Sequence, residues 1–92
     1  MQEIDFYKAI ALMRKETLPF TVVFVHLSLS KNEGGGLDKL ENVLVGALKK
    51  NMQARFMIGF KDPKGLEIRH IYLHSILELK LQTGEHYKLV LK

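Results

Sequence analysis

The sequence predicts a mostly β fold, α+β by strict count, with one helix at the N-terminus. Apolar residues recur at helical spacing over residues 5–16. Most later segments instead alternate apolar and polar residues, as half-buried strands do. Short turn motifs at residues 62–65 and 83–85 join neighbouring segments of this alternating kind. Short connections of that sort favour antiparallel pairing.

Residues 5–16 are the predicted helix. Asp5 is placed to act as the N-cap, because its carboxylate can accept hydrogen bonds from the free amides of the first turn. Pro19 ends the pattern and pushes the residue before it towards an extended conformation. The apolar stripe of this helix consists of Phe6, Ala9, Ile10, Leu12 and Met13.

The rest of the chain is predicted to supply four to five strands of an antiparallel sheet. The first strand is apolar on both faces in its first half, which predicts a central position. A loop over Ser30–Gly36 follows it. A sheet of this size must cover its apolar face, either by curling into a small barrel or by packing under the helix. The candidate strand ranges, of which 38–48 belongs to the segment that also fits a helix, are about 20–29, 38–48, 54–61, 66–73, 77–82 and 86–91.

One segment, residues 37–48, fits two structures. Leucines at helical spacing favour a helix, whereas Gly46 and the β-branched residues around it favour a strand. The pattern leaves both readings open.

The clearest hairpin signal is Asp62-Pro63-Lys64-Gly65. Asp at the first position, Pro at the second and Gly at the fourth suit a type I turn, with Gly65 free to adopt a positive φ. In the strand before this turn, Phe56, Ile58 and Phe60 share a face that we expect to be buried.

Size and composition predict one soluble domain. The 92 residues are 47% hydrophobic and 26% charged, the balance of an ordinary globular domain. There is no apolar run of the ~20 residues that a membrane span requires. The absence of cysteine and of a basic, then apolar, start leads us to expect a cytoplasmic protein without a secretory signal.

The formal net charge of +4 is concentrated between residues 49 and 69. Clustered cations of this kind can neutralise phosphates, so a nucleic-acid-binding module is the alternative functional hypothesis. Phe56 and Phe60 alternate away from Arg55 and Lys61, so the aromatic rings are not expected to stack on bases. The same cations also suit a solvated outer face. The candidate nucleic-acid-binding residues are Lys49, Lys50, Arg55, Lys61, Lys64 and Arg69.

Other constellations predict no catalytic residue, metal or cofactor. His70 and His74 would share one strand face with Tyr72, but a metal site requires further ligands that the neighbouring sequence does not offer. The serines stand in no nucleophile-elbow motif. The glycines at 34–36 lack the Lys-Ser/Thr that follows in a phosphate-binding loop.

Loose apolar motifs run along most of the chain. They are Pro19-Phe20-Thr21, Gly34-Gly35-Gly36-Leu37, Val43-Leu44-Val45-Gly46-Ala47, Ile58-Gly59 and Ile71-Tyr72-Leu73-His74-Ser75-Ile76-Leu77. Together with the N-terminal helix, these motifs resemble those of small uncharacterised proteins of bacterial prophages and integrated mobile elements. The resemblance implies a strand for residues 37–48 and carries no catalytic residue.

Together these observations predict a small non-enzymatic binding or structural domain. The expected partner is another protein or a second copy of the chain, and no small-molecule substrate is inferred. Met57, Ile71 and Val90 are expected on otherwise polar strand faces, where a cluster of them would form an interaction patch.

Overall fold

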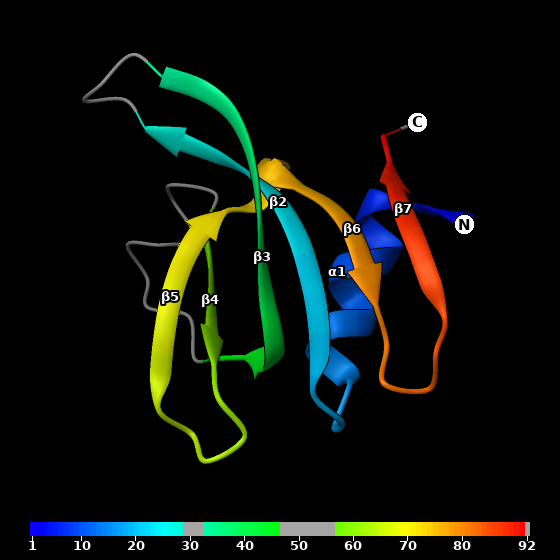
Figure 1. Cartoon of the computed structure of the whole chain (residues 1–92). Coiled ribbons are helices and arrows are strands. Elements are labelled where there is room, and N and C mark those ends of the chain that lie inside the picture. The colour runs from blue at the N-terminus through cyan, green and yellow to red at the C-terminus, as the bar shows by residue number, and fades with distance from the viewer. Residues whose placement is uncertain (29–32, 47–56, 92) are drawn as a thin grey trace.

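The computed structural model describes residues 1–28, 33–46 and 57–91. These residues form one α-helix, one 3-10 turn and a mixed sheet of seven strands in the order β1-β7-β6-β2-β3-β4-β5 (Figure 1). The sheet is open, with β1 and β5 at its edges. The elements are β1 Gln2–Asp5, α1 Phe6–Lys15, β2 Phe20–Ser28, β3 Glu33–Val45, β4 Met57–Lys61, β5 Glu67–Tyr72, η1 Leu73–Ser75, β6 Ile76–Lys80 and β7 His86–Val90.

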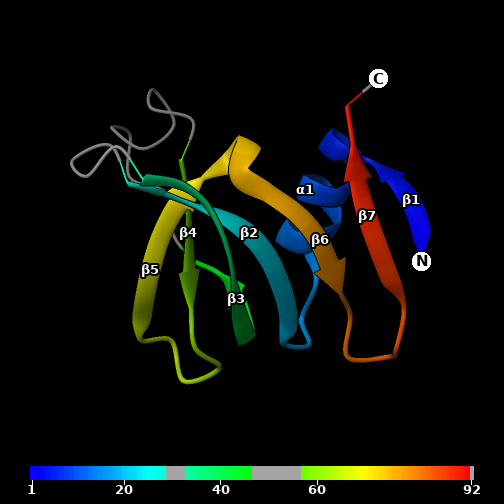
Figure 2. The same cartoon turned by 45° about the horizontal axis from the view of Figure 1, so that its top comes forward.

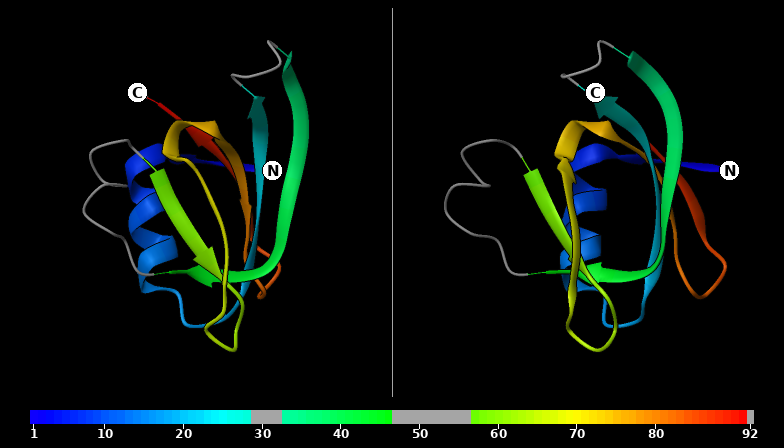
Figure 3. Two further views of the ribbon diagram at one scale, coloured as in Figure 1. Left: turned by 90° about the vertical axis from the view of Figure 1, so that its left-hand side faces the viewer. Right: turned by 60° about the vertical axis from the view of Figure 1, so that its left-hand side comes forward.

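Helix α1 confirms the predicted helix to within one residue at each end. The Asp5 carboxylate accepts hydrogen bonds from the backbone amides of Tyr7 and Lys8, at 3.1 and 3.2 Å. The helix lies on one side of the sheet, which curves partly around it (Figures 2 and 3). Its predicted apolar stripe is directed into the core: Phe6, Ala9, Ile10 and Met13 are buried and Leu12 packs against them.

Strand β2 is central, as predicted, with β6 on one side and β3 on the other. Residues 37–45, which the pattern left open between helix and strand, belong to strand β3. The predicted loop over Ser30–Gly36 is wrong in its second half, because β3 already begins at Glu33 and Gly36 pairs with His26. Glycine has no side chain whose packing could stabilise a strand. This part of β3 is held instead by its backbone hydrogen bonds to β2.

Four β-bulges in the described strands curl the sheet. Glu41 and Asn42 of β3 both stand opposite Thr21, and Asn42 has a positive φ of 57°. Gly35 of β3, Leu77 of β6 and Ile68 of β5 are likewise extra residues between successive pairs. A bulge bends its strand and increases the local twist. Beyond the bulge at Asn42, β3 leaves β2 and pairs with β4 instead, so β4 and β5 turn away from the plane of the other strands (Figure 1).

The predicted count of four to five antiparallel strands is too low, and the sheet is mixed. Strand β1 was missed; it runs parallel to β7, with Ile4 opposite Leu89. Four mostly polar residues carry no alternation that would predict a strand, and the partner lies at the other end of the chain. All other strand pairs in the described residues are antiparallel, as expected.

The return strand ends earlier than predicted, and this changes the position of one histidine. Strand β5 stops at Tyr72, and the 3-10 turn η1 follows, so His74 does not share a strand face with His70 as expected. The His74 ring instead stacks on Phe6, with centroids 5.1 Å apart and planes 3° from parallel. The Ser75 hydroxyl donates to the backbone carbonyl of Tyr72, which stabilises this turn.

The core lies between α1 and the inner face of the curved sheet. The rings of Phe20 and Phe60 pack edge to face, with their centroids 6.2 Å apart, and connect β2 to β4. The predicted burial of Ile58 and Phe60 is confirmed; Phe56 lies outside the described residues. The prediction that Ile71 lies on a polar face is wrong, because the register places Ile71 opposite Ile58 and both are buried.

Candidate functional site

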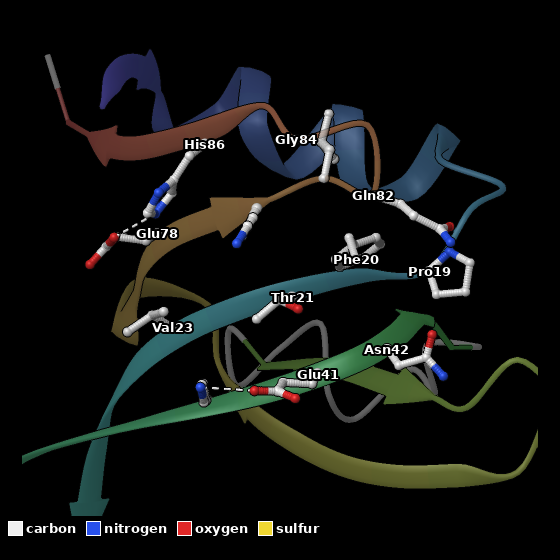
Figure 4. A pocket seen from close by; sticks show the side chains of 13 residues that line it. Pro19, Phe20, Thr21, Val23, Glu41, Asn42, Glu78, Gln82, Gly84 and His86 are labelled. Carbon is white, nitrogen blue, oxygen red and sulfur yellow. Dashed lines mark hydrogen bonds and ion pairs between the residues drawn. The ribbon is translucent and has the colours of Figure 1, made fainter.

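A hollow of about 560 Å³ lies over the outer face of β2. Thr21 and Val23 form its floor, and Pro19, Gln82 and Gly84 lie at one end (Figure 4). Strands β3 and β6 form its two walls, because both pair with β2. A central strand with small outward side chains between two strands with long ones produces this trough.

Acidic and basic side chains alternate around the hollow. In the strand register, Val23 lies between Lys39 of β3 and Glu78 of β6. One step along, Thr21 lies between the bulge containing Glu41 and Lys80 of β6. Each wall therefore presents one lysine and one glutamate, in opposite order. Opposite charges placed in this way across neighbouring strands stabilise a sheet surface.

Both glutamates of the hollow have partners inside it. Glu41 contacts the Lys39 ammonium at 2.8 Å. This hydrogen bond lowers the pKa of the Glu41 carboxyl and raises the pKa of Lys39, and the charge of Lys80 adds a smaller lowering for Glu41. Glu78 contacts Nε2 of His86 at 2.7 Å (Figure 4). Lys80 makes no ion pair with any residue that the structure describes.

Asn42 shapes the hollow through its backbone. Its left-handed φ is unusual for a residue other than glycine, but Asn adopts this region more readily than most side chains. Sequence reasoning missed this site. The available signal was the pair of motifs Lys39-x-Glu41 and Glu78-x-Lys80, whose proximity follows only from the pairing of β3 and β6 with the same strand.

The structure describes three of the six predicted nucleic-acid-binding residues; Lys49, Lys50 and Arg55 lie outside the described residues. Lys61 ends β4, and Lys64 is exposed in the turn that follows. Arg69 has a different environment from these two.

The Arg69 guanidinium lies inside the curl of the sheet. It stands over the Phe24 ring, 5.1 Å from the centroid, and 3.5 Å from a carboxylate oxygen of Asp38. Its register partner, Phe60, is a core residue, which places both side chains on the same face. These two contacts distinguish Arg69 from Lys61 and Lys64, and the assignment of all three to a nucleic-acid site stays a prediction.

The β4–β5 hairpin has a tightly bonded turn. Backbone bonds run from Asp62 N to Leu66 O and from Gly65 N to Asp62 O, both at 2.9 Å. The Asp62 carboxylate also accepts from the amides of Lys64 and Leu66, at 3.0 and 2.9 Å. As predicted, Gly65 has a positive φ, 92°. On this rigid turn Leu66 is 71% exposed, and Ile68 nearby is 47% exposed.

Histidine and carboxylate side chains do not gather into a metal site in the described part of the chain. His70 Nε2 lies 2.7 Å from Glu67 Oε1, an ion-pair contact whose orientation does not form a hydrogen bond. No helix among the described residues has both the length and the apolar character to cross a membrane.

The fold and its surface thus define a small domain with an open, strongly bulged mixed sheet around one helix. Comparison of the chain with protein-family models, curated proteins and solved structures finds no match in any of the three.

Proposed function

We propose that this chain is a small non-enzymatic binding domain that recognises a protein partner through the tip of its β4–β5 hairpin. A prophage or mobile-element origin stays a prediction from the resemblance. The observation that carries the proposal is Leu66, a leucine held in the open on a rigid backbone.

The second hairpin of the molecule shows that the turn itself does not need this leucine. Between β6 and β7, Leu81 N donates to Glu85 O and Gly84 N donates to Leu81 O, the same bonding pattern as in the first turn. Gly84 has a φ of 99°, close to that of its counterpart. The position equivalent to Leu66 is there occupied by Glu85. The geometry of this type of turn therefore does not require a leucine at the position of Leu66.

The exposure and the ordered backbone of Leu66 both favour binding to a partner. Full burial of a leucine side chain stabilises a protein or complex by roughly 1.5–3 kcal/mol. The free domain lacks this stabilisation because Leu66 is exposed. Because both the amide and the carbonyl of Leu66 are bonded to Asp62, binding would order little additional backbone. Ile68 enlarges the apolar surface, and the charges near it are mixed, because Lys61 and Lys64 lie close to Asp62 and Glu67. This combination fits an apolar pocket with a polar rim.

The arrangement of the described polar groups supports a non-enzymatic role. The Ser75 hydroxyl is buried and donates to a backbone carbonyl. The His86 ring is bonded to Glu78, and no serine or threonine side chain that the structure describes is bonded to it. A screen of esters, phosphoesters and nucleotides should give no turnover that a single substitution abolishes.

The binding proposal is tested by a photo-reactive residue placed at position 66 and, as the matched control, at position 85 of the other hairpin. We expect a protein to crosslink at 66 and not at 85. Once purified, that protein should bind the wild-type domain at least about tenfold more tightly than the Leu66→Ser variant. The Leu37→Ser variant removes an equally exposed leucine from β3 and should bind as wild type does.

Equal crosslinking at both positions, no crosslinking at either, or an affinity unchanged by Leu66→Ser would each overturn the proposal. Recovery of a nuclease-sensitive species would instead support the nucleic-acid alternative. In that case labelled DNA or RNA should bind the domain with steep salt dependence, and Lys61→Met with Lys64→Met should reduce that dependence.

A further inference from the structure

We propose that the hollow over β2 binds a small organic carboxylate, with the Lys80 ammonium as its counter-ion. This site is separate from the hairpin tip and does not depend on the proposed function. It follows from the charges, the neutral donors and the size of the hollow.

Lys80 is the lysine of the hollow that has no ion pair within the described residues. Glu41 is held by Lys39 at 2.8 Å, and Glu78 contacts Nε2 of His86 at 2.7 Å. Lys80 has no such contact in the described residues and influences Glu41 only through its field, which lowers the pKa of that carboxyl. An incoming anion can therefore contact this ammonium without displacing an ion pair. An anion–ammonium contact is among the stronger hydrogen bonds available in water.

Other polar groups surround that ammonium. In the strand register, Lys80 lies between Thr21 of β2 and His86 of β7, so the three share one face of the sheet. Asn42 and Gln82 also line the hollow, from the β3 bulge and the β6–β7 turn. Hydroxyl and amide groups can donate to a carboxylate without adding charge. A single negative charge suits this set better than a polyphosphate, which would require several cations.

The hollow also has room for the carbon body of such a ligand. Its volume of about 560 Å³ lies within the usual range of small-molecule sites. Val23 supplies apolar floor, and Pro19 supplies apolar surface at one end (Figure 4). A ligand with a carboxylate at one end and a compact apolar group at the other would use both kinds of surface.

The probe is benzoate, titrated into isotopically labelled protein and followed by NMR, with benzamide as its uncharged counterpart. We expect saturable shifts of the Thr21, Val23 and Lys80 amides with benzoate and a much weaker response to benzamide. Lys80→Met should weaken benzoate binding about tenfold or more. Lys8→Met removes the same charge from the exposed face of α1 and should leave binding unchanged.

Three results would overturn this assignment. These are shifts that do not saturate, an equal response to benzamide, or benzoate binding that survives Lys80→Met. Lys80 is exposed, so both lysine variants should fold, and the unchanged dispersion of their spectra confirms this. Thr21→Val provides a second test, because it removes a donor from the floor while retaining the β-branched shape; it should weaken benzoate binding and leave Leu66-dependent protein binding unaffected.

Discussion

Three of the described residues, Gly65, Gly84 and Asn42, hold backbone conformations that most side chains resist. Gly65 closes the β4–β5 turn with a φ of 92°, and Asn42 forms the β3 bulge with a φ of 57°. Glycine adopts a positive φ without a steric penalty, and Asn is among the few other residues that do so readily. The positive φ of Gly65 follows from a local motif, Asp-Pro-Lys-Gly, and was predictable. That of Asn42 depends on where β3 leaves β2, which no neighbouring residue indicates.

Replacing Gly65 with valine should lower the free energy of unfolding by roughly 1–3 kcal/mol, because a β-branched side chain is strained at a positive φ. The measurement is urea denaturation followed by circular dichroism. Gly36→Ala is the control: Gly36 has no positive φ, and an added Cβ would meet no atom within 4 Å, so stability should change little. A loss of stability as large for Gly36→Ala as for Gly65→Val would contradict this account of backbone strain.

At the scale of elements, α1 and β1 show opposite degrees of local encoding. The helix has a cap, an apolar stripe and basic residues in its last turn, so its sequence specifies it. Strand β1 has none of these signals and becomes a strand because β7 lies beside it. The two elements meet at Asp5, which ends β1 and caps α1.

Asp5→Ala should cost about 0.5–2 kcal/mol of stability, because two amides of the first turn of α1 lose their acceptor. Asp5→Ser, which keeps an acceptor oxygen, should recover most of this loss. Glu3→Ala, on the exposed part of β1, is the control and should be nearly neutral. Thermal unfolding of the four proteins at one pH provides the comparison. A Glu3→Ala effect as large as that of Asp5→Ala would assign the loss to β1 rather than to the cap.

At the scale of the whole molecule, Arg69 links the outer strand β5 to the centre of the sheet. Its guanidinium contacts Phe24 of β2 and Asp38 of β3, two residues that pair with each other in the register. Asp38 is half exposed, so the ion pair is screened by water and salt. The stacking of the guanidinium on the buried Phe24 ring should therefore contribute more than the ion pair.

A pair of double-mutant cycles separates these two contacts. Arg69→Met combined with Phe24→Leu should show a coupling of about 0.5–2 kcal/mol that changes little with salt. Arg69→Met combined with Asp38→Asn should show a coupling of at most about 1 kcal/mol that declines in high salt. Unfolding free energies in urea at low and high salt supply both values. A larger coupling to Asp38 than to Phe24 would contradict this account.

The hairpin tip and the hollow differ in the same way, because one is formed by residues close in the chain and the other by distant segments. The hairpin tip was accessible from the sequence, because Asp62, Gly65 and the flanking alternation are close together in the chain. The hollow was not, because its walls come from segments about forty residues apart that meet only across β2. The predicted basic cluster joined Lys61 and Lys64 to Arg69, whose side chain the register directs inward to Phe24.

The sequence by itself determined the features whose causes lie within a few residues. These are helix α1 with its cap, the two glycine turns, the buried face of β4 and the central position of β2. Only the tertiary structure decided that residues 37–45 form a strand, that β1 joins the sheet in parallel, and that Ile71 is buried while Leu66 is exposed. The physical reason is that backbone hydrogen bonds within a helix or turn connect near neighbours, whereas those of a strand connect distant segments. Register, bulges and curl therefore depend on which partners meet.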